Sequence, residues 1–176
     1  EYNGYKAYWN DGAQVVAPHD KNIIAEVQKI TSPDQVLTNG HKDNIVILDE
    51  TFDAIYLDAV HSLSLSPEAI AAHHDLKIVY TPIHGTGVIL VPESLRKFGF
   101  TNVVTVKEQN IPDGNFPTVA SPNPEERATM KMAIDLAARQ QAEIVLATDP
   151  DADRIGMALR DRDGSYILLN GNQTCA

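Results

Sequence analysis

The sequence predicts an α/β protein in three layers, in which helices cover both faces of a mostly parallel β-sheet. The first observation is that short apolar runs typical of buried strands alternate with segments of helical periodicity from about residue 75 onward. The second is that a turn rich in glycine or aspartate directly follows two of these runs. Strands that alternate with helices need crossover connections, which make the strands parallel.

Residues 1–48 are expected to form a separate segment, built from a strand hairpin and a helix. The turn NDG lies between YKAYW and AQVV, and Asn and Gly tolerate the positive φ of a tight hairpin. Asp20 is expected to cap a helix. Its apolar residues keep helical spacing: Ile23, Ile24, Val27 and Ile30.

Residues 49–165 are expected to form an α/β domain, and residues 166–176 to lie after it. The apolar spacing over 52–63 predicts an amphipathic helix. Three strands are predicted at LKIVYT, NVVTVK and EIVLAT, and a closing hairpin at RIGMALR and SYILL around the turn DRDG.

Two helices are predicted to connect the three strands. The first ends at Phe98, because Gly99 is suited to the left-handed conformation after a helix. The second begins with Asn123 as its cap and Pro124 at its first position. The expected buried stripe of this second helix is Ala128, Met132, Ala133 and Leu136.

Composition restricts the class of protein. The 176 residues carry a formal net charge of −10, which argues against a nucleic-acid-binding surface. No apolar run approaches the ~18 residues of a membrane-spanning helix, so we expect no membrane partner. The single cysteine, Cys175, fits a reducing compartment, and we expect a cytoplasmic protein. We also expect this chain to be a piece of a longer protein.

Three aspartates follow the third predicted strand at every second position: Asp149, Asp151 and Asp153. Carboxylates this close repel one another unless a cation lies among them. In open α/β sheets, ligands bind beyond the carboxyl ends of the strands, which is where these residues should lie. Oxygen ligands alone favour magnesium, calcium or manganese. The alternative is a solvated turn without a metal, since Asp and Pro are common turn residues.

An EF-hand calcium loop does not fit these residues. Arg154 stands where that loop needs glycine, and Arg160 where it needs a bidentate glutamate. Three carboxylates leave a magnesium ion open positions for water or a phosphate oxygen. Arg154 adds a guanidinium fork suited to a phosphate. The residues therefore predict a metal site for phosphate chemistry.

Four stretches of the chain resemble the α-D-phosphohexomutases, the phosphoglucomutase and phosphomannomutase family, and they occur in that family's order. They are EYNGYKAYWNDGAQVV, TPIHGTG, PDGNFP and DPDADR. The first resembles the stretch after the family's phosphoserine loop, and the last resembles its metal-binding loop. The residues of the first stretch are similar to those of the branch of the family that contains bacterial phosphoglucomutases and the phosphopentomutases.

The resemblance implies an intramolecular phosphotransferase that interconverts hexose 1-phosphate and hexose 6-phosphate through a phosphoserine and a bisphosphorylated sugar. It implies magnesium ligation by the three aspartates, contact of Arg154 with the transferring phosphate, and proton transfer assisted by Lys6. The alternative for Lys6 is a surface lysine on a strand. The resemblance also implies that residues 1–48 are the remnant of a preceding α/β domain, the phosphoserine domain, that residues 49–165 are the second domain, and that residues 166–176 start a linker to a third. The family's serine would lie upstream of Glu1 and its sugar-selecting domains after Ala176, so we expect this chain alone to be inactive.

The glycine-bearing turn after the first strand comprises His84, Gly85, Thr86 and Gly87. We expect it to be an active-site loop, with His84 pointing near the metal, or else bonding its own backbone. The same glycines match the first two glycines of the dinucleotide-binding motif G-x-G-x-x-G, but Leu90 stands where the third glycine belongs. The alternatives to a hexomutase are therefore a phosphopentomutase of the same family, a nucleotide-cofactor-binding domain of an oxidoreductase, and a non-catalytic binding module.

Overall fold

The computed structural model describes residues 6–40 and 42–175, and the chain divides into two compact units. Unit 1 is Glu1–Ile47 and unit 2 is Leu48–Ala176. The division falls one residue before the expected boundary. Tyr5 and the other residues of the EYNGY stretch lie outside the described residues.

Unit 1 holds a small hairpin turn followed by short helices. Tyr8 and Gln14 form an antiparallel bridge, and Gly12 lies at the turn with φ of 83°. The helix α1 (His19–Val27) follows, and then the 3₁₀ turns η1 (Pro33–Gln35) and η2 (Lys42–Asn44). The capping role expected for Asp20 is wrong. The residue before the helix is Pro18, without a side-chain cap, and Asp20 lies in the first turn.

Unit 2 is an α/β domain, as the sequence predicts. Its α-helices are α2 (Glu50–His61), α3 (Pro67–Ala72), α4 (Leu90–Phe98), α5 (Arg127–Gln140) and α6 (Gly171–Cys175). Its strands are β1 (Ile78–Thr81), β2 (Val103–Thr105), β3 (Ile144–Thr148), β4 (Ile155–Arg160) and β5 (Tyr166–Leu169). Two 3₁₀ turns, η3 (Thr86–Val88) and η4 (Lys107–Gln109), follow β1 and β2.

The five-stranded sheet has the order β2-β1-β3-β4-β5. β1 pairs in parallel with β2 and with β3, whereas β3, β4 and β5 are antiparallel neighbours. The sheet is therefore mixed rather than mostly parallel, because the short turns after β3 and β4 reverse the chain. β5 belongs to this sheet, so unit 2 does not end at residue 165.

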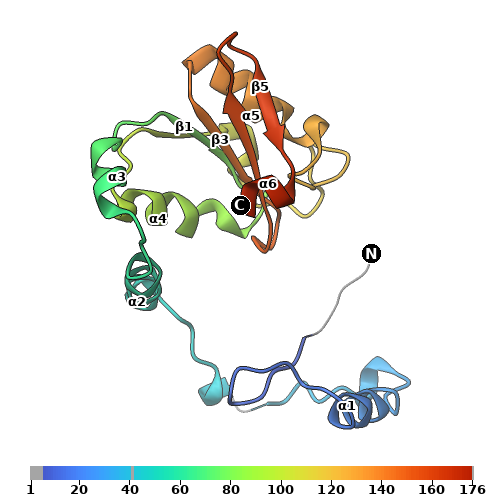
Figure 1. The fold of residues 1–176 in the computed structure, drawn as a ribbon. Helices are drawn as coiled ribbons and strands as arrows, with labels where there is room; N and C mark the ends of the chain where they lie inside the picture. Colours follow the sequence, from blue (N-terminus) through green and yellow to red (C-terminus); the bar gives the residue numbers. More distant parts are fainter. Residues whose placement is uncertain (1–5, 41, 176) are drawn as a thin grey trace. The chain divides into compact units, whose positions relative to one another are not determined.

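The two crossover connections cover opposite faces of the sheet. The chain crosses from β1 to its neighbour β2 through α4, and then crosses back over β1 to β3 through α5. The two crossovers therefore run in opposite directions along the sheet. Since such crossovers are right-handed, α4 and α5 lie on opposite faces (Figure 1). α5 packs on β1 and β3, and α2 packs against α4. The core between α5 and the sheet includes Val79, Met130, Ala133, Val145 and Ala158.

In unit 2 the helix ends follow their local chemistry, with one difference from the prediction. Gly99 takes the left-handed conformation after α4, as expected. α5 begins at Arg127, three residues later than predicted. Pro124 instead packs on β4, where a Cβ on Gly156 would come within 2.8 Å of the Pro124 carbonyl carbon. Pro124 therefore lies in the turn that precedes α5 and not in the helix itself.

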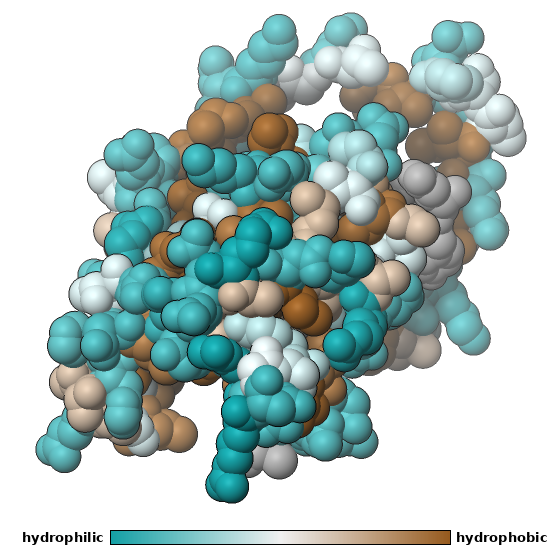
Figure 2. Space-filling model, turned by 90° about the horizontal axis from the view of Figure 1, so that it is seen from above, coloured by the Kyte–Doolittle hydropathy of each residue, from teal (hydrophilic) through white to brown (hydrophobic). Residues whose placement is uncertain are grey.

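Polar residues cover most of the face drawn in Figure 2, and apolar residues show between them. Several large apolar side chains are exposed, notably Leu37, Ile45, Val46, Ile47 and Leu48. Among the described residues, no helix has the length and the apolar character needed to cross a membrane.

Candidate active site

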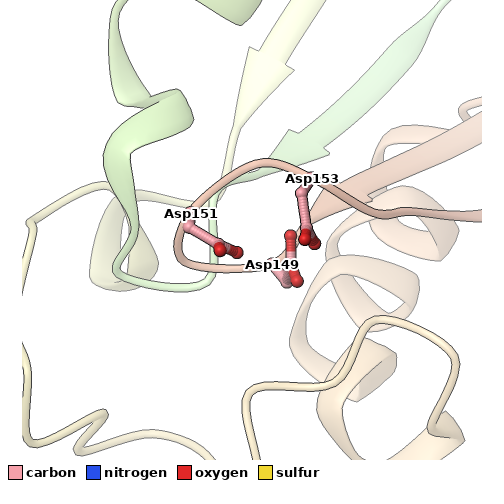
Figure 3. A group of neighbouring side chains, drawn as sticks. All are labelled: Asp149, Asp151 and Asp153. Carbon is pink, nitrogen blue, oxygen red and sulfur yellow. The ribbon is translucent and has the colours of Figure 1, made fainter. Parts of the chain in front are cut away.

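The three aspartates converge on a loop at the carboxyl end of β3. The chain leaves β3 at Thr148, and the amide of Ala152 donates to the carbonyl of Asp149 at 3.0 Å. Ala152 has φ of 58°, so the loop curls back on itself. One carboxylate oxygen from each of the three aspartates lies within 4.8 Å of the others. Figure 3 shows the carboxylates pointing toward one another.

Asp149 is the anchored member of this group. Its side chain is buried, whereas Asp151 and Asp153 are exposed. The backbone amide of Arg154 donates to Asp149 Oδ1 at 3.0 Å, and Arg154 Nε donates to Asp149 Oδ2 at 2.8 Å. The same Nε lies 3.6 Å from Asp153 Oδ1. Arg154 therefore fixes the inner carboxylate and lies beside the outer one.

The charges and hydrogen bonds of the loop shift the pKa values of Asp149 and Asp153 in opposite directions. Burial alone would raise the pKa of Asp149, but the backbone amide and guanidinium of Arg154 outweigh it and lower that pKa. The pKa of Asp153 is raised, first by hydrogen bonding and charge repulsion with Asp149, and less by Asp151. The loop thus concentrates negative charge that Arg154 offsets only in part.

This donor set fits a hard divalent cation. All three candidate ligands are carboxylate oxygens, which favour magnesium, calcium or manganese over zinc. The Asp149 oxygens that accept from Arg154 each keep a further lone pair for a metal. Three carboxylates are few for calcium, which takes ~6–8 oxygens, whereas magnesium usually keeps several waters. Asp149, Asp151 and Asp153 are therefore the residues that could hold magnesium.

The glycine turn after β1 lies directly against the aspartate loop. The amide of Thr86 donates to the carbonyl of Pro150 at 2.8 Å, and Thr86 Oγ1 donates to the same oxygen at 3.1 Å. A Cβ on Gly85 would lie 2.6 Å from that oxygen, and a Cβ on Gly87 2.7 Å from Thr148 Oγ1. Both glycines are needed for this close approach, since any side chain would overlap the neighbouring atoms.

Tyr80 joins these two segments, and nothing in the sequence pattern singled it out. Its hydroxyl donates to the carbonyl of Gly87 at 3.1 Å and lies 2.8 Å from Thr148 Oγ1. Burial raises the pKa of Tyr80 to about 12. In sequence, Tyr80 looks like any core residue of a buried strand, because the two partners of its hydroxyl come from elsewhere in the chain.

The ring of His84 contacts another loop rather than its own backbone. Its ring nitrogens lie 2.9 Å from the carbonyl oxygen of Ile111 and 2.9 Å from Thr118 Oγ1, both in the loop of residues 110–118. Of the described residues, the group of possible metal ligands contains only the three aspartates. Among the described residues the ring bonds this loop and not its own backbone, so the second interpretation of His84 is wrong, whereas its place near a metal stays a prediction.

Lys6 lies in unit 1 and is exposed. Its role in proton transfer stays a prediction. Leu90, the residue that breaks the dinucleotide fingerprint, is the first residue of α4.

Comparisons with known proteins identify the family. Residues 54–164 match the family model described as phosphoglucomutase/phosphomannomutase, alpha/beta/alpha domain II. The chain is 40% identical over 176 residues to a probable phosphomannomutase of Haemophilus influenzae, covering 98% of this chain and 35% of that protein. It is 38% identical over 180 residues to a probable phosphoribomutase of Schizosaccharomyces pombe, covering 98% of this chain and 30% of that protein.

A solved structure supports the same fold. A putative phosphomannomutase from Thermus thermophilus aligns with a TM-score of 0.52 and 22% identity, covering 68% of this chain and 25% of that chain. The chain thus spans about a third of the length of the two relatives above. These matches confirm the resemblance found in the sequence and argue against the dinucleotide-binding alternative. The chain belongs to the phosphoglucomutase/phosphomannomutase family and carries its α/β/α domain II.

Proposed function

We propose that this chain is part of a magnesium-dependent phosphohexomutase that interconverts hexose 1-phosphate and hexose 6-phosphate. The observation that carries the proposal is the convergence of three carboxylates at the end of β3, with Arg154 paired to the buried one. Phosphoryl transfer depends mainly on positioning and on charge neutralisation, which this arrangement supplies.

Each residue of the loop has a separate task in this proposal. Asp149, Asp151 and Asp153 bind the magnesium ion, which when bound neutralises charge on the transferring phosphoryl group. Arg154 uses Nε to hold Asp149 in place. In the described part of the chain, no hydrogen bond of Arg154 involves its Nη groups, so these donors are the ones we assign to the phosphate. Asp149 thereby sets the direction of the guanidinium.

Two further features come from the resemblance alone. Lys6 assists proton transfer near a phosphoserine, and the reaction passes through a bisphosphorylated sugar. The serine loop of the family, T-x-S-H-N-P, does not occur in these 176 residues. We therefore propose that the isolated chain has no mutase activity. The loss of positioning alone can cost about 7–11 kcal/mol of barrier lowering. We also propose a cytoplasmic location for the whole protein.

The test is a mutase assay on the longer protein that contains this chain, with glucose 1-phosphate, a glucose bisphosphate primer and magnesium. We expect Arg154→Gln to lower kcat about 10²–10³-fold, the usual cost of losing a donor to developing negative charge. Arg139→Gln, an exposed arginine at the end of α5, is the matched control and should keep full activity. Equal activity in both variants would contradict the role of Arg154.

A pentose phosphate is the second candidate substrate. It is favoured by the 38% identity to a probable phosphoribomutase. The same assay with ribose 1-phosphate in place of glucose 1-phosphate separates the two. A higher kcat/KM for the ribose compound would assign the longer protein to the phosphopentomutases.

A further inference from the structure

A buried polar network lies beneath the glycine turn, and His84 is its centre. His84 is 4% exposed. Its backbone amide donates to the carbonyl of Gln109 at 2.9 Å, and its carbonyl accepts from the amide of Asp113 at 3.0 Å. The ring adds contacts with the Ile111 carbonyl and the Thr118 hydroxyl. This one residue therefore makes four hydrogen bonds to a single stretch, residues 109–118.

The left-handed backbone at this point makes these bonds possible. His84 has φ of 60° and Ile83 has φ of 47°, although a β-branched residue strongly disfavours that region. The loop of residues 110–118 has a left-handed residue of its own, Phe116, and the aspartate loop has Ala152. Strain of this kind persists only where the surroundings fix the backbone, and it gathers at functional sites.

The network has one consistent direction of proton donation. Thr81 Oγ1 accepts from the amide of Ile83 and donates to Gln109 Oε1, at 2.7 Å, because that amide oxygen can only accept. The Gln109 amide nitrogen therefore donates to Thr118 Oγ1, at 3.0 Å. Thr118 then has its own proton to give to His84 Nε2.

The other ring nitrogen completes the assignment. Nδ1 faces the Ile111 carbonyl, which only accepts, so Nδ1 carries the proton. Nε2 is then the unprotonated nitrogen that accepts from Thr118. In this form every hydrogen bond of the network has one donor and one acceptor.

The network is connected to the aspartate loop through the next two residues. Gly85 follows His84 and lies against Pro150, and Thr86 donates twice to the Pro150 carbonyl. Pro150 separates Asp149 from Asp151. A shift of the glycine turn would therefore move the backbone between two of the proposed metal ligands.

We propose that His84, as the neutral Nδ1–H tautomer, is a positioning residue that locks the loop of residues 110–118 to the glycine turn and thereby holds Pro150 and the aspartate loop in place. The proposal rests on the proposed function only in so far as that loop binds magnesium. The mechanical coupling from Thr118 to Thr86 holds with or without the ion.

The tautomer is tested first, on the unchanged protein. In a sample with ¹⁵N-labelled histidine rings at neutral pH, the His84 signals should show a protonated Nδ1 and an unprotonated Nε2. The signals are assigned by their loss in His84→Asn, a variant that tolerates positive φ. An Nε2–H tautomer, or two protonated nitrogens, would overturn the network.

The coupling is tested by amide hydrogen exchange with a matched pair of variants. Thr118→Val removes the hydroxyl but keeps the shape, and Thr118→Ser keeps the hydroxyl. We expect Thr118→Val to speed exchange about tenfold at both the Asp113 and Thr86 amides, while the buried strand amide of Val145 is unchanged. Thr118→Ser should match the unchanged protein at all three. Faster exchange at Asp113 alone would show that the loop is not coupled to the glycine turn.

A magnesium titration of the same two variants extends the test to the ion. Thr118→Val should bind magnesium several-fold more weakly than Thr118→Ser. If the unchanged chain bound no magnesium while the exchange result held, the metal assignment would fail and the positioning role of His84 would stand. Equal magnesium affinity in the two variants would contradict the proposal that the network around His84 positions the aspartate loop.

Discussion

The peptide carbonyl of Pro150 accepts two hydrogen bonds from Thr86, one from the backbone amide at 2.8 Å and one from the side-chain hydroxyl at 3.1 Å. Sixty-four residues separate the two along the chain. The turn after β1 and the loop after β3 are therefore one structural unit, which parallel pairing of β1 with β3 brings together at the same edge of the sheet.

This close approach predicts that Gly85→Ala destabilises unit 2. The added Cβ would lie 2.6 Å from the Pro150 carbonyl oxygen, so one of the two loops must move. Overpacking of this kind costs about 1–3 kcal/mol, which urea unfolding measures. Gly114→Ala is the matched control, because a Cβ there meets no atom of the described residues within 4 Å. Equal unfolding free energies for the two variants would show that the loops are not in contact.

Tyr80→Phe should also lower the free energy of unfolding, by about 1–2 kcal/mol. The variant leaves the Gly87 carbonyl without its donor and removes the partner of the Thr148 hydroxyl in a buried site. Tyr56→Phe, at an exposed tyrosine of α2, should change stability by less than about 0.5 kcal/mol. Thermal unfolding of both variants measures the difference. If Tyr80→Phe lost no more stability than Tyr56→Phe, the Tyr80 hydroxyl would contribute nothing to the stability of the fold.

The raised pKa of Asp153 comes mainly from Asp149. Asp149→Asn should therefore bring the pKa of Asp153 down toward its ordinary value of 3.8. Asp151→Asn should lower it less, because Asp151 contributes a smaller repulsion. A carboxyl ¹³C titration by NMR reports both changes. The reverse order of the two variants would contradict the geometry of the loop.

The lowered pKa of Asp149 predicts a pH dependence of stability. Because the folded pKa lies below 3.8, ionised Asp149 stabilises the fold at higher pH, and this contribution is lost as the pH falls through the folded value. Arg154→Gln should reduce the contribution, because the guanidinium is lost while the backbone amide of residue 154 still donates to Asp149. Urea unfolding between neutral pH and the acid range measures it. Arg160→Gln is the control and should keep the dependence of the unchanged protein.

Much of unit 2 could be predicted from local patterns. The strands at LKIVYT, NVVTVK and EIVLAT, the end of α4 at Gly99 and the helix α2 all depend on nearby residues, and they are confirmed. The aspartates and the glycine turn could also be found, because parallel strands bring their carboxyl ends together. The short α3 and α6 carry too few residues for a periodic pattern to appear.

The errors come from contacts between distant residues. The start of α5 is shifted because Pro124 packs on Gly156. The fully buried residues of that helix are Thr129, Met130, Ala133 and Ala137, of which the sequence predicts only Ala133. His84 turns toward Ile111 and Thr118 because its left-handed backbone directs it there, and no spacing rule predicts positive φ at a histidine beside glycines.

The most direct test of the metal assignment is a magnesium titration of this chain followed by thermal unfolding. A ligand that binds only the folded chain stabilises it by about 2.7 kcal/mol at 100 times its dissociation constant. We expect magnesium to raise the Tm of the unchanged chain and of Asp75→Asn, which removes an exposed carboxylate before β1, but not that of Asp151→Asn. Equal rises in all three would contradict a metal site at Asp149, Asp151 and Asp153.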